Sequence, residues 1–298
     1  MTKMNDAFSR YHPAVEFLFF SGAIVLGMFI VHPVLSGISL LAALSYHLLL
    51  RGRRGLAMVP GMILFIPFIA LLNALLVQEG ETLLFCWLGG RRVTLEAFVY
   101  GLGTGMTFVS VLLWFSCYNV VMTSDKFISL FGKLIPALSL LLCMILRLVP
   151  GFKNKADAIS GARRCIGKAP SDAERMDKLR SSGDILSVLT SWALENSVIT
   201  ADSMKSRGYG TGERTNFTIY RRDSRDILVF TVLLLMVGLT FSALVSGAVS
   251  AEFYPCLSFG RPGPMAAAGT AAYAVFLFIP SFLHIREELT WRILRSKI

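Results

Sequence analysis

The chain has 298 residues, of which 54% are hydrophobic and only 16% are charged, and its mean hydropathy is +0.63. Soluble domains carry about 25% charged residues, so this composition excludes a soluble globular protein and predicts an integral membrane protein. The net charge of +10 in such a chain reports orientation and contact with lipid. No basic surface interleaved with aromatic residues accompanies it, so we expect the lipid bilayer, and no nucleic acid, among its partners.

The apolar runs predict an all-α fold with about six transmembrane helices. A helix needs about 20 mostly apolar residues to cross a bilayer. No small-residue cleavage site follows the first run, so we interpret that run as a retained span. The turn at His32-Pro33 predicts that the first two spans form a helical hairpin. The expected spans cover residues 14–31, 34–50, 60–77, 97–121, 226–247 and 266–284.

Basic residues beside the spans predict the orientation of the chain. Arg51-Gly-Arg-Arg54 follows the second span, and loops rich in Lys and Arg remain in the cytoplasm. With six spans, the N-terminus and the basic C-terminal residues from Arg286 to Lys297 then also lie in the cytoplasm. Arg91 and Arg92 fall in a predicted outer loop and oppose this orientation.

A region over 122–225 separates the N-terminal membrane helices (1–121) from the C-terminal ones (226–298). Its apolar part, Leu134 to Val149, is bracketed by Pro136 and Pro150. We expect it to be too short and too interrupted to span, and to lie partly embedded or packed under the bundle. Residues 151–225 carry 14 Lys and Arg against 9 Asp and Glu, a net charge of +5. This excess places the segment in the cytoplasm.

Two long amphipathic helices are predicted within this region. Ser171 and Glu174 form a capping box between them, and Gly208, Gly210 and Gly212 can take the left-handed conformations that end a helix. Both helices end in a basic patch followed by glycine. The apolar stripe of the first helix comprises Phe152, Ala156, Ile159 and Ile166. The face of the second, through which we expect the two helices to pack, comprises Ile185, Leu189, Trp192 and Ile199.

The second helix ends in Met204-Lys-Ser-Arg-Gly-Tyr-Gly210, which resembles a motif of one transporter family. The family is the transmembrane (T) component of energy-coupling factor (ECF) transporters, of the EcfT or CbiQ type, a branch of the ABC transporters. Its members carry two long cytoplasmic coupling helices, each ending in Ala-Arg-Gly. Thr123-Ser124, Leu146-Arg-Leu-Val-Pro150 and Ala158-Ile159 resemble the same family, and the resemblance covers about 98–215.

The first copy of the motif departs from the family pattern. The family register places Cys165-Ile166-Gly167 where Ala-Arg-Gly is expected. Either Arg163 or Arg164 substitutes for the missing arginine, or the first helix makes a mostly apolar contact through Ile166. Arginine offers five donors in a fixed fork, and the glycine after it lets another backbone approach closely.

The resemblance implies a coupling subunit without chemistry of its own. Its helix ends would dock on two ABC-type ATPase subunits, identical or different, and its membrane helices would hold a separate substrate-binding membrane protein, the S component. The family imports vitamins or transition-metal ions such as cobalt or nickel across the plasma membrane of bacteria or archaea. The implied docking residues are Ser206, Arg207, Gly208, Tyr209 and Gly210 in the second helix, and Arg163, Arg164, Ile166 and Gly167 in the first.

The sequence contains no catalytic, metal or nucleotide motif. No G-x-x-x-x-G-K-[ST], H-E-x-x-H or G-x-S-x-G occurs, so we expect no cofactor on this chain, and ATP and Mg²⁺ on the partner subunits. The five cysteines form no C-x-x-C pair, and the four histidines are dispersed. Gly101-Leu-Gly-Thr-Gly105 lies within an apolar run, where it favours close contact between helices.

Two other functions compete with energy coupling. A self-contained secondary transporter needs discontinuous helices or a charged site at the midplane, and a membrane-embedded enzyme needs clustered acid, base or metal ligands. The polar candidates within or beside the spans are Asn73, His47 and Asn119. They are too sparse for either function.

Overall fold

The computed structural model describes residues 8–77, 80, 82–87, 91–132, 135–167, 175–211, 223–249, 251–254, 258–259 and 263–295. The chain forms two compact units. The membrane unit comprises residues 1–126 and 220–298, and the paired-helix unit comprises residues 127–219. The chain therefore leaves the membrane unit once and returns to it once.

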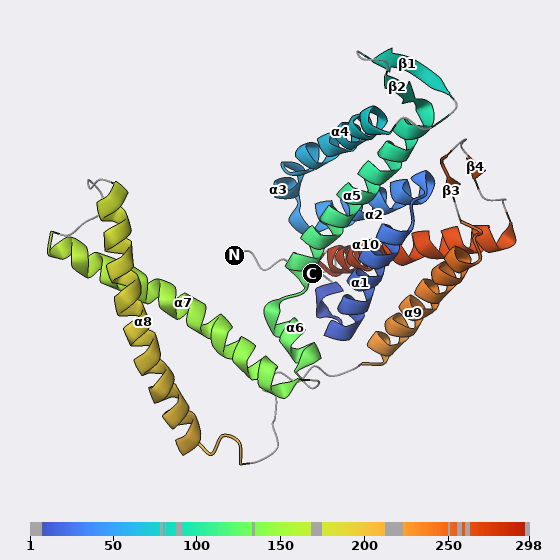
Figure 1. Cartoon of the computed structure of the whole chain (residues 1–298). Helices are drawn as coiled ribbons and strands as arrows, with labels where there is room; N and C mark the ends of the chain where they lie inside the picture. Colours follow the sequence, from blue (N-terminus) through green and yellow to red (C-terminus); the bar gives the residue numbers. More distant parts are fainter. Residues whose placement is uncertain are drawn as a thin grey trace. The chain divides into compact units, whose positions relative to one another are not determined.

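The membrane unit is built from helices with two short strand pairs at its loops (Figure 1). Strand β1 (Leu83–Trp87) pairs with β2 (Arg91–Thr94), and β3 (Ala251–Glu252) pairs with β4 (Ser258–Phe259), both antiparallel. The helices are η1 (Phe8–Arg10), α1 (Pro13–Phe29), α2 (Pro33–Arg51), α3 (Arg53–Leu56), α4 (Val59–Leu76), α5 (Leu95–Val121), α9 (Ser224–Val245) and α10 (Pro264–Arg295), and α6 (Ser124–Phe131) begins in this unit.

The all-α membrane fold predicted from the sequence is confirmed. Among the described residues, six helices are long and apolar enough to cross a membrane. Five of them, α2, α4, α5, α9 and α10, coincide with predicted spans. The sixth is α7 (Pro136–Cys165), so the expectation that the apolar stretch after residue 134 is too short to span is wrong. The first predicted span forms α1, an apolar helix of only 17 residues. A tilt-free span needs about 17–25 residues, so α1 still has spanning length.

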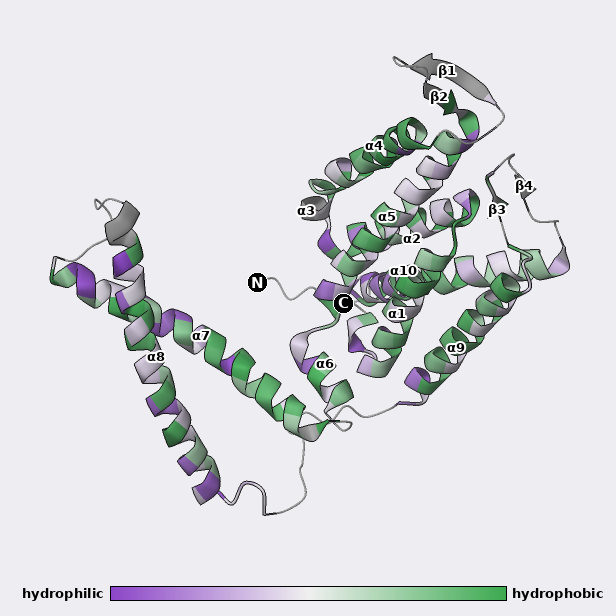
Figure 2. Ribbon diagram, in the orientation of Figure 1, coloured by the Kyte–Doolittle hydropathy of each residue, from purple (hydrophilic) through white to green (hydrophobic). Residues whose placement is uncertain are grey.

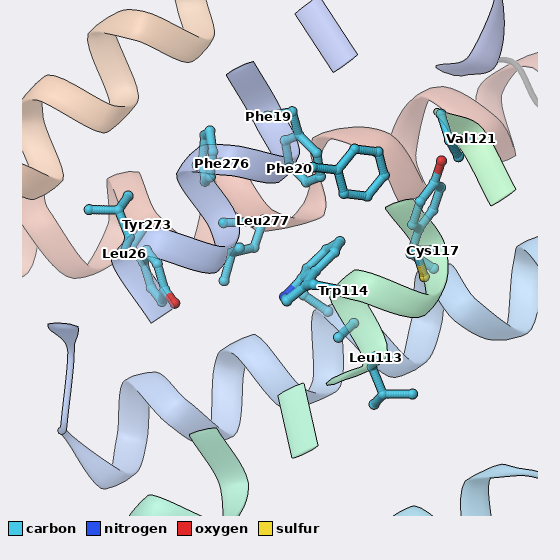
Figure 3. Packing of buried hydrophobic residues seen from close by; sticks show 14 of the residues in the cluster. Phe19, Phe20, Leu26, Leu113, Trp114, Cys117, Val121, Tyr273, Phe276 and Leu277 are labelled. Atoms are coloured by element: carbon cyan, nitrogen blue, oxygen red, sulfur yellow. The ribbon is translucent and has the colours of Figure 1, made fainter. Parts of the chain in front are cut away.

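Helix α5 lies at the centre of the membrane unit and packs against α1, α2 and α4. Its Trp114 is fully buried, and its ring contacts that of Phe19 on α1, edge to face, with centroids 5.4 Å apart. Phe276 of α10 closes the same cluster, 5.1 Å from Phe19 (Figure 3). The Trp114 indole N–H donates to Ser39 Oγ of α2 at 3.3 Å, which satisfies its one polar group. This cluster joins four helices.

Glycines let α4 and α5 approach closely. A Cβ on Gly101 would lie 2.8 Å from the Cα of Ala70, and one on Gly105 would lie 3.0 Å from the carbonyl oxygen of Ile66. Both obstacles are backbone atoms, which cannot move aside as a flexible side chain can. The sequence predicted that the glycines of 101–105 allow close contact between helices and do not form a nucleotide loop. The packing of α5 against α4 agrees with this prediction.

The paired-helix unit consists of α7 (Pro136–Cys165, 30 residues) and α8 (Arg175–Ser206, 32 residues), together with the C-terminal part of α6. The expected interruption of the apolar stretch at Pro150 is wrong, because Pro150 lies inside a continuous helix. Pro136 occupies the first turn, where a missing N–H costs nothing. The apolar N-terminal half of α7 and its polar C-terminal half are visible in Figure 2.

A substitution pair tests the contact between α4 and α5. Gly101→Ala should lower the apparent unfolding temperature, because overpacking against backbone costs about 1–3 kcal/mol. Gly103→Ala should leave it unchanged or raise it, since a Cβ there meets nothing within 4 Å and alanine is the better helix former. Thermal unfolding in detergent, followed by tryptophan fluorescence, compares the two variants. Equal shifts for both would contradict this packing.

Candidate functional site

Helices α7 and α8 contact each other through an aromatic and cationic cluster. The rings of Phe152 (α7) and Trp192 (α8) meet edge to face, with centroids 5.7 Å apart. Lys155 Nζ lies 5.6 Å from the centroid of the Trp192 ring, a cation–π distance. Ile185 and Leu189 lie half-buried on the same face of α8. The packing face therefore extends over two turns on the N-terminal side of Trp192.

Ile199 does not belong to this contact. Its side chain is 59% exposed, which corrects the expectation that it packs with Trp192. The exposed residues of α8 after Trp192 also include Val198, Thr200 and Ala201. Two helices that cross diverge beyond the crossing point, so a face that is apolar in the sequence can extend past the region where its partner covers it.

The C-terminus of α8 ends in a Schellman motif built on Gly208. The Tyr209 N–H donates to the Met204 carbonyl at 3.0 Å, and the Gly208 N–H donates to the Lys205 carbonyl at 3.0 Å. This bond pair requires a left-handed residue after the helix, and Gly208 takes it with φ +72°. Arg207 is consequently the C-cap residue of α8, and its backbone N–H donates to the Ser203 carbonyl at 3.2 Å.

The residues around this helix end form an exposed polar surface. Ser206, Arg207 and Gly210 are exposed, and Tyr209 is 45% exposed. Gly210 is also left-handed, with φ +95°, and the Thr211 hydroxyl donates to the Gly208 carbonyl at 2.7 Å. The loop therefore folds back on the helix end and leaves the Arg207 side chain at the surface. A guanidinium in this place can pair with a carboxylate of another molecule.

The C-terminus of α7 ends in a similar way but carries different residues. Ile166 lies just beyond the helix and Gly167 is left-handed, with φ +76°; its N–H donates to the Arg164 carbonyl at 3.1 Å. Phe152, Ala156 and Ile159 are half-buried, as expected of an apolar stripe. Ile166 is 69% exposed, which corrects its assignment to that stripe: the helix ends before Ile166 can continue its periodicity.

The two arginines before this end have different surroundings. Arg163 Nη2 donates to Asp184 Oδ2 of α8 at 3.0 Å, and its side chain is only 19% exposed. Arg164 is exposed. Successive residues on a helix point about 100° apart, so the pairing of Arg163 with α8 leaves Arg164 directed elsewhere. Arg163 thus joins α7 to α8, and Arg164 is the arginine presented at the surface.

Sequence reasoning missed a buried ion pair in the membrane unit. Glu16 of α1 is fully buried, and its Oε1 accepts a hydrogen bond from Lys126 Nζ at 2.6 Å. A signal for this pair existed, because Glu16 is an acidic residue within an apolar run, and such residues are rare without a partner. The polar candidates that were considered are dispersed: His47 is buried, Asn73 half-buried and Asn119 exposed.

Over the part of the chain that the structure describes, no group of three or more His, Cys, Asp or Glu residues could hold a metal ion. His47 Nδ1 lies 3.9 Å from the Cys117 thiol, a weak contact between two buried residues. The capping box predicted at Ser171 and Glu174, and the helix-ending role of Gly212, lie outside the described residues.

A comparison with protein families finds one match over most of the chain. The profile of the CbiQ family, described as "Cobalt transport protein", matches residues 7–218. This range includes α1 to α8 and both glycine-terminated helix ends. No curated protein matches the chain.

The geometry of Gly208 makes a direct prediction. Gly208→Ala should loosen the end of α8, because a left-handed conformation costs an L-residue about 1–2 kcal/mol. Amide hydrogen exchange at Tyr209 should become faster. Gly183→Ala, in the same helix where a Cβ meets nothing within 4 Å, is the matched control and should not accelerate it. Unchanged exchange at Tyr209 in Gly208→Ala would contradict the assigned role of this glycine.

Proposed function

Because the chain belongs to the CbiQ family of cobalt transport proteins, we propose that it is the scaffold and energy-coupling (T) subunit of an ECF-type importer. In this function it transmits ATP-driven motion of partner ATPases to a separate membrane protein that binds the substrate. Cobalt transport is the function for which the family is named. The family match and the two exposed helix ends together support the proposal.

The observation that carries it is the pair of helix ends in the paired-helix unit. Each end has an exposed arginine before a left-handed glycine: Arg207 directly precedes Gly208, and Arg164 lies three residues before Gly167. A rigid helix that ends in a cation at a fixed position can lie in a carboxylate-lined groove of a partner. Because glycine has no Cβ, the partner's backbone can come close to the helix end. Two such ends on one unit match two ATPase subunits.

The missing arginine of the first motif is replaced, in this proposal, by Arg164. Arg163 already bonds Asp184, and its use in docking would break the bond between α7 and α8. Arg164 needs no rearrangement to reach a partner. Shortly after it, Ile166 supplies an exposed apolar side chain, and Gly167 supplies a stretch of backbone that a partner can approach closely. The two ends are therefore unequal, one charged and apolar, the other charged and glycine-rich, which suits two different ATPase surfaces.

The apolar half of α7 fits the second partner, the substrate-binding membrane subunit. Its exposed side chains share one face at spacings of three and four residues, and the most hydrophobic part of α7 has no buried residue. A surface of this kind is unstable in water and is covered by lipid or by another membrane protein. The residues of this face are Leu138, Leu141, Ile145 and Val149.

Catalysis resides on the partners in this account. The chain contains no phosphate-binding loop, so ATP and Mg²⁺ bind to the ATPase subunits, and this subunit is not an enzyme. The protein spans the membrane several times. The basic residues of 151–225 and Arg51 support a cytoplasmic location for both termini and for the polar C-terminal half of α7 and α8. In this proposal the membrane is the plasma membrane of a bacterium or an archaeon, and the partner ATPases reach these helices from the cytoplasm.

Charge reversal tests docking. Arg207→Glu should lose the ATPases in a pulldown of detergent-solubilised complex, and Arg164→Glu should weaken their retention, because each places a carboxylate against the acidic groove. The loss of a charge-assisted bond and the new repulsion together cost about 2–5 kcal/mol. Lys153→Glu, an exposed reversal in the middle of α7, is the matched control and should retain the ATPases.

Arg163→Gln separates the two neighbouring arginines. It should retain the ATPases and lower only the stability of the paired-helix unit, by about 0.2–1 kcal/mol for a partly exposed pair. Loss of the ATPases in Arg163→Gln with retention in Arg164→Glu would reverse the assignment. Failure of the wild-type chain to bind any ABC-type ATPase would overturn the proposed function itself.

A further inference from the structure

Three consecutive residues of η1 make contacts in three different directions. Phe8 is fully buried, and its ring meets those of Phe19 at 5.4 Å and Tyr46 at 6.5 Å, both edge to face. Ser9 accepts hydrogen bonds from a lysine side chain of α6, and Arg10 Nη1 bonds Glu287 Oε1 of α10 at 2.7 Å. A short helix with so many partners is held firmly in place.

The lysine bound by Ser9 is Lys126, which is nearly buried. Its Nζ donates to the Ser9 carbonyl at 2.6 Å, to the Ser9 hydroxyl at 3.0 Å and to Glu16 Oε1 at 2.6 Å. A longer contact of 3.4 Å reaches the Val121 carbonyl at the end of α5. An ammonium group has three donors, so the site satisfies all of them and pairs the charge with a carboxylate.

Lys126 is also the last residue of the membrane unit before the chain enters the paired-helix unit. The chain returns at residue 220, and α9 begins soon afterwards at Ser224. In the first turn of α9, Asp226 completes a capping box with Asp223. Asp226 Oδ1 also accepts a hydrogen bond from the His12 N–H at 3.4 Å. The same N-terminal segment therefore contacts α6, before the paired-helix unit in the chain, and α9, after it.

Tyr11 supports this arrangement. Burial raises the pKa of its hydroxyl, and the nearby Asp226 carboxylate raises it further, whereas Arg225 and Arg286 oppose the shift. Charged groups of α9 and α10 thus act on this tyrosine. The contacts of Phe8 to His12 together reach α1, α2, α6, α9 and α10.

We propose that residues Phe8–His12 are a clasp that holds the start of α6 and the start of α9 in the membrane unit, with Lys126 as its positioning residue. These are the membrane-unit helices that precede and follow the paired-helix unit in the chain. The inference rests on the proposed function of energy coupling. Force applied to α7 and α8 moves the membrane helices only if the starts of α6 and α9 do not yield. The clasp supplies that fixed point. Without it, the ATPases can bind and hydrolyse ATP while the starts of α6 and α9 shift and the other membrane helices stay in place.

The test uses the complete complex with its ATPases and substrate-binding subunit in proteoliposomes, with Co²⁺ as the transported probe. Lys126→Met removes the ammonium group and keeps the length of the side chain. It should retain the ATPases and their ATP hydrolysis, while Co²⁺ uptake per ATP falls about tenfold. Arg292→Met, which breaks the exposed pair of Arg292 with Glu288, is the matched control and should transport as the wild type does.

A second variant separates coupling from folding. Lys126→Met leaves Glu16 buried without its cation, which can unfold the protein. Glu16→Gln/Lys126→Met has no buried charge and should fold like the wild type, with an unchanged unfolding temperature, yet it should remain uncoupled because the bonds to Ser9 are lost. Wild-type uptake per ATP in this double variant overturns the clasp and leaves the ion pair a purely structural feature.

Hydrogen exchange of the wild-type complex gives an independent test without substitutions. The amides of Tyr11 and His12, which donate to the Phe8 carbonyl and to Asp226 Oδ1, should stay protected when ATP is added, while those at the ends of α7 and α8 change. Loss of protection at Tyr11 and His12 during turnover contradicts a fixed point. An absence of ATPase binding in the wild type is a different result, since it removes the proposed function rather than the clasp.

Discussion

The membrane unit depends on how one buried ammonium group is accommodated. Lys126 lies where water is nearly excluded, and Glu16 together with both oxygens of Ser9 satisfies its donors. Removal of one partner from a buried ion pair costs about 3–5 kcal/mol, so α1, η1 and α6 must keep their mutual positions. Phe8 carries this constraint into the aromatic core. Trp114 there connects α1 to α5, and the glycines of α5 connect it to α4.

The paired-helix unit obeys a different constraint, because much of its surface is exposed. The two helices adhere through the Phe152–Trp192 contact and the Arg163–Asp184 pair. Each then ends at a glycine whose left-handed conformation terminates the helix at a defined residue. A defined end fixes the position of the preceding arginine relative to the helix axis. Stable internal contacts combined with exposed, sharply terminated ends are the features expected of an element that transmits motion between partners.

Hydropathy and helix-ending signals predicted most of the fold, and three-dimensional pairing could not be predicted. The spans, the long helices α7 and α8, and their terminations at Gly167 and Gly208 follow from local sequence. The continuity of α7 through Pro150 was missed, because a proline signals a break although a helix tolerates the loss of one hydrogen bond. The exposure of Ile199 was missed because the stripe shows which face is apolar but not how far its partner extends. The sequence could not show that Arg163 is paired and Arg164 exposed, because this depends on the position of Asp184, a residue of another helix.

In the proposed function, this chain supports transport only together with the ATPases and the substrate-binding subunit, and it transports nothing alone. Co²⁺ uptake into proteoliposomes, measured with external ATP for the chain alone and for the complete complex, tests it most directly. The account predicts no uptake and no ATP hydrolysis by the chain alone, and uptake that depends on ATP once the ATPases and the substrate-binding subunit are present. Accumulation of Co²⁺ by the chain alone would contradict it and would identify a self-contained transporter.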